Sequence, residues 1–354
     1  MNNFRALIAV VAALGFTANA TADPMFAGLQ RLSLDTAPNE NIDVALWYPT
    51  TTVSREQSLG PFTMTVALDA PFAATALIAS TELTARPLII VSHGTGGNSM
   101  THHELASALA RFGYLVAALT HPGDNFRDRS MVGTPKYFSE RPRQVSRVID
   151  ALLTDATWKP RIDATRIGFI GHSAGGFTGL ALAGATPSIN AMVHHCAENY
   201  DTDLWFCRVS GSKVKASGSA KQVDYMPQAP NSRDSRIRAA ALVAPVGAFF
   251  TETELKKISI PVRVLVAGQD AVLIPRFHAA FVGRSIPNAE VVTSDAGGHF
   301  MLVSKLNINP VAIKERSSIR VHRDVTVMRP SATRQKRFRC GSIKRWRSKH
   351  RNAV

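Results

Sequence analysis

The sequence predicts an α/β fold in which a mostly parallel central sheet carries helices on both faces. Three observations predict it. From residue 87 onward, short apolar runs alternate with helix-length segments. One of these runs ends in the turn Gly171-His-Ser-Ala-Gly175, and an apolar helix-length segment follows directly. The 354 residues are 45% hydrophobic and 19% charged, which suffices for a sizeable core and excludes a disordered chain.

The elements of the predicted sheet can be placed in order along the chain. Residues 29–34 and 42–48 suit two antiparallel strands, and residues 51–85 have no clear periodicity and are interpreted as a long surface excursion. Strands are then predicted at 88–92, 114–120, 166–170, 237–243, 262–267 and 291–293, with helices at 101–111, 141–153 and 175–183. This alternation indicates right-handed β-α-β crossovers.

The first 22 residues have the pattern of a secretory signal peptide. One early cation, Arg5, precedes an apolar run from Ala6 to Phe16, and small residues follow at Ala18, Ala20 and Ala22. The run is about half the roughly 20 apolar residues that span a bilayer. We therefore expect export to the periplasm or the medium, and a mature chain without a transmembrane segment.

The strong positive charge is concentrated in the last fifty residues. The chain has a net charge of +15, and residues 305–354 contain 15 Lys and Arg against two acids, Glu315 and Asp324. The first 304 residues therefore carry only +2. We expect a main domain over residues 23–304 and a basic, poorly ordered tail over 305–354.

The turn at Ser173 is the most informative motif. A strand, the pattern G-x-S-x-G and a helix in direct succession are typical of a nucleophile elbow. The turn is so tight that side chains at positions 171 and 175 would collide with the neighbouring chain, which accounts for the glycines. Ser173 is the predicted nucleophile.

A serine nucleophile requires a base and an orienting carboxylate. The predicted strand 262–267 is followed by Asp270, and a Gly-rich loop after residue 293 presents His299. We assign His299 as base and Asp270 as acid, with Asp295 as the rival acid. The other histidines after Ser173 fit less well, since His194 and His195 precede Asp270 and His278 follows it too closely.

An acyl-transfer site also needs two N–H donors for the oxyanion. The elbow supplies the N–H of Ala174, and the Gly-rich turn Ser92-His-Gly-Thr-Gly-Gly97 supplies that of Thr95. A phosphate-binding loop is the alternative for this turn, but it lacks G-x-G-x-x-G and a Lys-Ser/Thr pair.

Several residues around these turns are candidates for contact with the substrate: His93, Gly94, His121 and His172. Together with His102 and His103, the histidines at 93 and 121 could suggest a metal, but none has the spacing of a known metal motif. We expect neither a metal nor an organic cofactor.

A polar insert over residues 196–236 separates a predicted helix from the strand at 237. It is interpreted either as a lid over the carboxyl ends of the strands or as a loop without a role. Cys196 and Cys207 lie within it, and a disulfide and two reduced thiols are equally compatible with their spacing.

Five segments together carry a family resemblance: residues 46–49 (LWYP), 92–97 (SHGTGG), 120–124 (THPGD), 171–175 (GHSAG) and 298–300 (GHF). Over residues 28–302 the chain resembles the predicted dienelactone hydrolases of the α/β-hydrolase superfamily, which are similar to the platelet-activating-factor acetylhydrolases. The resemblance implies the triad Ser173, Asp270 and His299, and Thr95 and Ala174 as oxyanion donors. It also implies hydrolysis of carboxylic esters with a small or moderate acyl group. Position 173 is a departure, since true dienelactone hydrolases use cysteine there, so the family name says little about the substrate.

The tail is a second departure, because an α/β-hydrolase normally closes with an amphipathic helix packed on the sheet. Residues 311–354 have basic residues on every face, so a replacement of the final helix through a shifted reading frame is one hypothesis. Three functions remain in view. The first is a serine esterase, the second a lipase or polyester hydrolase with the same triad, and the third a non-catalytic protein whose tail binds a polyanion such as nucleic acid.

Overall fold

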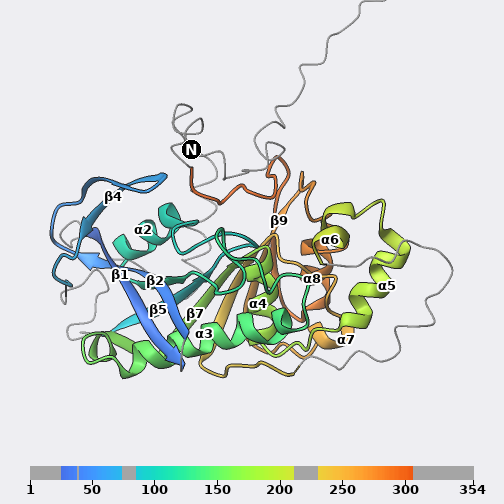
Figure 1. Cartoon of the computed structure of the whole chain (residues 1–354), viewed down its shortest axis with the longest axis horizontal. Coiled ribbons are helices and arrows are strands. Elements are labelled where there is room, and N and C mark those ends of the chain that lie inside the picture. The colour runs from blue at the N-terminus through green and yellow to red at the C-terminus, as the bar shows by residue number, and fades with distance from the viewer. Residues whose placement is uncertain (1–24, 38–39, 74–84, 211–229, 306–354) are drawn as a thin grey trace, which may run out of the picture. The chain divides into compact units, whose positions relative to one another are not determined.

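A ten-stranded sheet with the order β10-β9-β8-β7-β5-β6-β2-β1-β4-β3 forms the centre of the described structure (Figure 1). The computed structural model describes residues 25–37, 40–73, 85–210 and 230–305. The predicted signal peptide and nearly all of the basic tail lie outside these ranges.

The strands of one half of the sheet are parallel, as predicted. Within this half, every pair of neighbouring strands is parallel. They are β5 (Arg86–Ser92), β6 (Leu115–Leu119), β7 (Ile162–His172), β8 (Ile237–Val243), β9 (Val262–Ala267) and β10 (Glu290–Ser294). Strands β5 and β6 are buried at every position, which explains their continuous apolar sequence. Parallel strands place their carboxyl ends at one edge, where the loops after β5, β7, β9 and β10 can meet.

The other half of the sheet is mostly antiparallel. Strands β1 (Phe26–Ala37) and β2 (Glu40–Thr50) pair antiparallel, and β2 joins the parallel half through β6. The prediction of a featureless excursion over 51–85 is wrong for residues 55–68, which form the hairpin of β3 (Arg55–Leu59) and β4 (Phe62–Leu68). Alternate side chains of β4 are buried in one of the two cores: Phe62, Met64 and Val66. Residues 74–84 lie outside the described ranges.

Helices cover both faces of the sheet, as predicted (Figure 1). Helix α2 (His103–Arg111) packs on β1, β2 and β6 and closes one core with Leu105 and Leu109. Helices α3 (Lys136–Thr154) and α4 (Ala174–Leu182) belong to the other core, which contains Val145, Ile149 and Phe177. The shorter helical segments are η1 (Lys159–Arg161), α7 (Glu252–Leu255) and α8 (Ala279–Ser285).

The first residues of the predicted insert lie inside a helix that begins before it. Cys196 lies inside helix α5 (Ile189–Asn199), whose first turn is capped by Ser188 accepting a hydrogen bond from the N–H of Ala191. Helix α6 (Leu204–Val209) follows, and a disulfide between Cys196 and Cys207 joins the two helices. The bond answers the question that the spacing left open, while residues 211–229 of the insert lie outside the described ranges.

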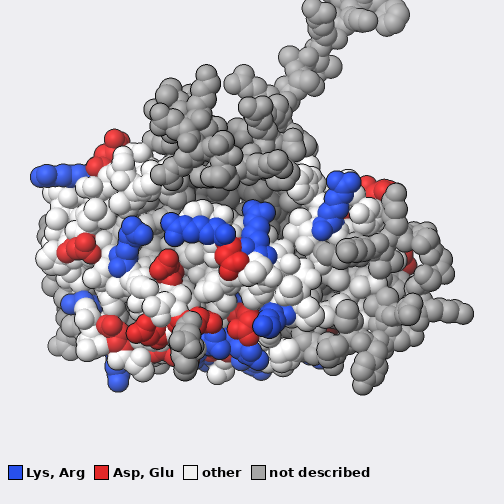
Figure 2. All heavy atoms as spheres, viewed as in Figure 1, with Lys and Arg blue, Asp and Glu red and all other residues white. Residues whose placement is uncertain are grey.

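The described surface carries charges of both signs. In Figure 2 the Lys and Arg side chains are interspersed with Asp and Glu over the visible described face. This agrees with the small net charge of residues 1–304. Among the described helices, none combines the length and the apolar character needed to cross a membrane.

Candidate active site

Ser173 occupies a strained turn between strand β7 and helix α4. Its backbone has φ 56° and ψ −115°, in the region that a residue with a side chain rarely adopts. The N–H of Ser173 donates to the carbonyl of Val243, and its carbonyl accepts from the N–H of Val246. A Cβ at Gly171 would lie 2.2 Å from the Gly175 oxygen, and one at Gly175 would lie 2.0 Å from the Ser92 oxygen. Only glycine therefore permits this turn.

The Ser173 hydroxyl begins a chain of three side chains from three different loops. Its Oγ lies 2.9 Å from Nε2 of His299, and Nδ1 of His299 lies 2.7 Å from Oδ2 of Asp270. The other oxygen of Asp270 accepts the N–H groups of Val272 at 2.9 Å and Leu273 at 2.8 Å. These bonds orient the carboxylate toward the ring. Because a carboxylate only accepts hydrogen bonds, Nδ1 of His299 donates to it, and Nε2 is the acceptor for the hydroxyl proton.

The rival acid lies elsewhere. Asp295 follows β10 and is exposed, whereas Asp270 and His299 are both buried. Among the described residues, Asp270 is the carboxylate that hydrogen-bonds the His299 ring. Its place after β9, next to β10 in the sheet, accounts for this contact.

The turn after β5 lies directly against the serine. A Cβ at Gly94 would be only 3.1 Å from Cβ of Ser173, so a side chain at position 94 would crowd the serine. Thr95 follows in this turn, and Ala174 is the first residue of α4. Within the described chain, no hydrogen bond from the N–H of Thr95 or of Ala174 to another protein group is present. Both donors are therefore available to a ligand atom beside Ser173.

The rings of His93 and His121 face the protein interior. Nδ1 of His93 donates to the Gly94 carbonyl, and its Nε2 accepts the N–H of His121. Nδ1 of His121 donates to the side chain of Gln144, and its Nε2 accepts from the hydroxyl of Ser92. All four ring nitrogens have protein partners, so these rings support the loops. The expected contact of His93 and His121 with a substrate stays a prediction. Gly94, the fourth residue of this set, lies against Ser173.

His172 is also buried. Its Nε2 donates to the backbone carbonyl of His299 at 2.9 Å. Its Nδ1 has no hydrogen-bond partner among the described residues. The ring is thus held against the loop of His299, and the expected contact of His172 with a substrate stays a prediction.

Burial keeps these histidines neutral. Desolvation is the main cause that lowers the pKa of His93, His121 and His172 well below the usual value of 6.5. For His93 and His121, the nearby cation of Arg141 lowers the pKa further. Neutral rings can both donate and accept, as the hydrogen bonds above require.

Behind these histidines lies a buried ion pair that the sequence reasoning missed. The guanidinium of Arg141 donates to the carboxylate of Asp124 at 2.5 Å, and both side chains have no exposed surface. Arg141 lies four residues before Val145 on the buried face of α3. A cation on the apolar stripe of an amphipathic helix is the signal that could have identified it.

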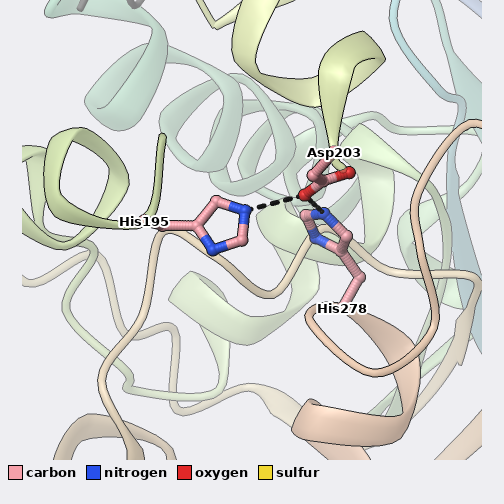
Figure 3. A group of neighbouring side chains, drawn as sticks. All are labelled: His195, Asp203 and His278. Carbon is pink, nitrogen blue, oxygen red and sulfur yellow. Dashed lines mark hydrogen bonds and ion pairs between the residues drawn. The ribbon is translucent and has the colours of Figure 1, made fainter. Parts of the chain in front are cut away.

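A second, largely buried cluster lies near the disulfide and could be taken for a metal site (Figure 3). Nε2 of His195 and Nε2 of His278 lie 2.8 Å and 2.7 Å from the same oxygen of Asp203. The backbone N–H of Gly247 donates to Nδ1 of His278 at 3.1 Å, so the proton of that ring is on Nε2. A metal ligand needs a free lone pair on Nε2, and histidine ligands usually donate from the other nitrogen. The cluster therefore fits a hydrogen-bonded bridge better than a metal site.

Comparisons with known proteins agree with this architecture. The sequence profile of the alpha/beta hydrolase family matches residues 88–305. A protein of Pseudomonas syringae pv. syringae (strain B728a) named "Putative carbamate hydrolase RutD" is 26% identical over 237 residues, which cover 60% of this chain and 86% of that protein. The profile spans more than half of the chain, from β5 to the loop of His299, and both comparisons support hydrolase activity. The chain therefore belongs to the alpha/beta hydrolase family.

Proposed function

We propose that this protein is a serine hydrolase that cleaves carboxylic esters through an acyl-enzyme. One observation carries the proposal: the continuous hydrogen-bonded chain from Oγ of Ser173 through the His299 ring to Asp270. It is the arrangement that a serine needs to become a nucleophile at neutral pH.

The proposed reaction begins when Nε2 of His299 takes the Ser173 proton and Oγ bonds to the ester carbonyl carbon. The carbonyl oxygen becomes an oxyanion that the N–H groups of Thr95 and Ala174 stabilise. The C–O bond to the alcohol then breaks, and the alcohol leaves with the proton of His299. Water repeats the sequence on the acyl-enzyme and releases the acid, while Asp270 keeps the imidazole in the required tautomer.

Aromatic side chains next to the site support an apolar substrate. Phe300 directly follows His299, stacks edge-on against its ring and remains 46% exposed. Phe126 is 57% exposed, and its N–H donates to Gly97 of the turn beside Ser173. These apolar surfaces support a lipase or polyester hydrolase with the same triad as the alternative form of this proposal. We also propose that the protein belongs to the predicted dienelactone hydrolase group.

The experiment is turnover of p-nitrophenyl acetate, butyrate and octanoate by residues 23–354, beside Ser173→Ala and the control Ser130→Ala. Ser130 is exposed and lies outside the hydrogen-bonded chain. Activity that Ser173→Ala abolishes and Ser130→Ala retains supports the proposal. Folded protein that is inert toward all three esters contradicts it.

Carbamate hydrolysis is a second candidate, favoured by the name of the Pseudomonas relative. The same serine can attack a carbamate, but an ordinary esterase would be trapped as a stable carbamoyl-enzyme. We therefore compare p-nitrophenyl acetate with p-nitrophenyl N-methylcarbamate. An esterase gives a burst of one equivalent of nitrophenol with the carbamate, whereas a carbamate hydrolase continues to turn over.

We also propose that the mature protein is exported to the periplasm or the medium, and that the insert predicted over residues 196–236 serves as a lid over the substrate. The disulfide between Cys196 and Cys207 supports export, because such bonds persist in oxidising compartments. Cell fractionation with an antibody tests the location. A full-length, uncleaved chain in the cytoplasm would contradict it.

A further inference from the structure

Arg141 is buried in helix α3, and each of its three guanidinium nitrogens donates a hydrogen bond. Nη1 donates to Asp124, and Nε donates to the hydroxyl of Thr178 at 3.0 Å. Nη2 donates to the carbonyl of His93 at 2.6 Å and to the hydroxyl of Ser92 at 3.2 Å. A fully buried cation is costly unless it is paired and fully hydrogen-bonded, so a purely apolar core would be the simpler solution at this position.

One side of this network holds the turn that carries Thr95. Arg141 bonds the carbonyl of His93, and its partner Asp124 accepts the N–H of Gly96 at 2.9 Å. The ion pair thus fixes backbone groups on both sides of the segment Gly94–Thr95. The phenol of Tyr137, also on α3, lies 3.3 Å from the hydroxyl of Thr95.

The other side holds the start of helix α4. Thr178 accepts the hydrogen bond from Arg141 and donates its own proton to the carbonyl of Ala174 at 3.0 Å. Ala174 is the second proposed oxyanion donor. The two donors belong to segments far apart in the sequence, and Arg141 with Asp124 and Thr178 bonds to both segments.

The charges around the guanidinium are balanced locally. Asp124 is its ion-pair partner in the described structure, and His93, His121 and Gln144 offer only dipoles. The ring of Tyr137 also lies near it, with its centroid 5.8 Å from the guanidinium carbon. The network therefore provides fixed geometry next to the site and little net charge.

We infer that Arg141 is a positioning residue that sets the separation of the Thr95 and Ala174 N–H groups in the oxyanion hole. The inference rests on the proposed function. A guanidinium is suited to this because its planar fork holds several acceptors at fixed angles, which a lysine cannot do.

The test compares Arg141→Met, Arg141→Lys and Thr178→Val with controls of the same chemistry. Arg143→Met removes an exposed arginine of the same helix, and Thr154→Val removes an exposed hydroxyl at its end. Thr178→Val leaves the buried ion pair intact and keeps the side-chain shape, so it remains informative if Arg141→Met does not fold. The readouts are kcat, KM and inhibition by a trifluoromethyl ketone, which forms a tetrahedral oxyanion on a serine.

We expect Arg141→Met to lower kcat by about 100-fold, comparable to the loss of one oxyanion donor, with KM within about twofold of the parent. Inhibition by the ketone should weaken by a similar factor. Arg141→Lys and Thr178→Val should lie between the parent and Arg141→Met, and both controls should match the parent. Hydrogen exchange of the amides in residues 93–97 and 174–178 should accelerate in the same order.

Three results would overturn the inference. The first is that Arg141→Lys and Thr178→Val fold and keep the kcat of the parent. The second is that the variants change KM but not kcat, and the third is that the two controls lose as much kcat as the variants. A parent that turns over no ester would refute the proposed function itself, and with it the role of Arg141 in the reaction. Normal parent turnover with unaffected variants would refute only the role of Arg141.

Discussion

The side chain of His172 is bonded to the backbone of His299, with Nε2 of the first 2.9 Å from the carbonyl oxygen of the second. His172 is the last residue of β7, His299 lies on the loop after β10, and the centroids of their rings are 5.0 Å apart. The residue next to the proposed nucleophile thereby anchors the loop that carries the proposed base. By holding the backbone of His299, this contact helps to keep the His299 ring within hydrogen-bond distance of Ser173.

Replacing His172 by Phe tests this anchor. Phenylalanine keeps a buried ring of similar size but cannot donate to the His299 carbonyl. A hydrogen bond contributes about 0.5–1.5 kcal/mol, so we expect kcat to fall by about two- to tenfold with KM unchanged. The measurement is steady-state turnover of p-nitrophenyl butyrate beside the control His194→Phe, an exposed position. An increase in KM alone would instead favour the original expectation that His172 contacts the substrate.

The bridge from His195 and His278 to Asp203 makes stability depend on pH. Burial alone would raise the pKa of Asp203, but hydrogen bonds from the two histidines lower it to about 2. Because the folded pKa is below the ordinary value of 3.8, the bridge stabilises the fold above that value. This stabilisation is lost as the pH falls from about 4 to about 2.

Asp203→Asn keeps the shape of the side chain and removes its charge. Hydrogen bonds to a charged group contribute about 1.5–3 kcal/mol, so the variant should lose about that much free energy of unfolding at pH 7. Urea unfolding at pH 7 and at pH 3 measures the difference, which should shrink at the lower pH. A difference that stays constant between the two pH values would show that the carboxylate charge is not its source.

The sequence predicted those parts of the fold in which a single pattern determines the structure. The parallel strands are continuous apolar runs, and the turn at Ser173 permits one backbone path because its glycines have no room for a side chain. The hairpin of β3 and β4 escaped prediction because β3 has no buried apolar stripe of its own. Its register comes from pairing with β4, where alternate residues are buried.

The supporting residues of the site were harder to predict than the residues at its centre. Ser173, Asp270 and His299 each follow a predicted strand, and they meet because parallel strands end at one edge of the sheet. Arg141 has no motif around it, and its partners come from β5, the loop after β6 and helix α4. The histidines at 93 and 121 look like pocket residues in the sequence, and the hydrogen bonds that hold their rings depend on partners that only the folded chain brings together.

The proton on Nε2 of His278 predicts the response to metal ions. Zinc binding at Asp203 would require that proton to leave or the bond from Gly247 to break. We therefore expect equimolar zinc chloride to leave the Tm unchanged and EDTA to leave ester turnover unchanged. Differential scanning calorimetry of the parent and of His195→Ala provides the comparison. A rise in Tm with zinc that is lost in His195→Ala would establish a metal site at this cluster.

The disulfide between Cys196 and Cys207 predicts that a reductant lowers the stability of the protein. Cys196 and Cys207 are separated by 11 positions, and closing a loop of this length restricts the unfolded chain by about 3 kcal/mol. In a Cys340→Ser background, which removes the third thiol, Cys196→Ala/Cys207→Ala should lose about that free energy of unfolding in urea. Dithiothreitol should lower the stability of the background protein to a similar degree and leave the double variant unchanged. Equal sensitivity of both proteins to the reductant would show that this bond does not contribute to stability. Both cysteines are buried, so any loss of unfolding free energy in the alanine variant would in that case come in part from the cavity that the substitutions leave.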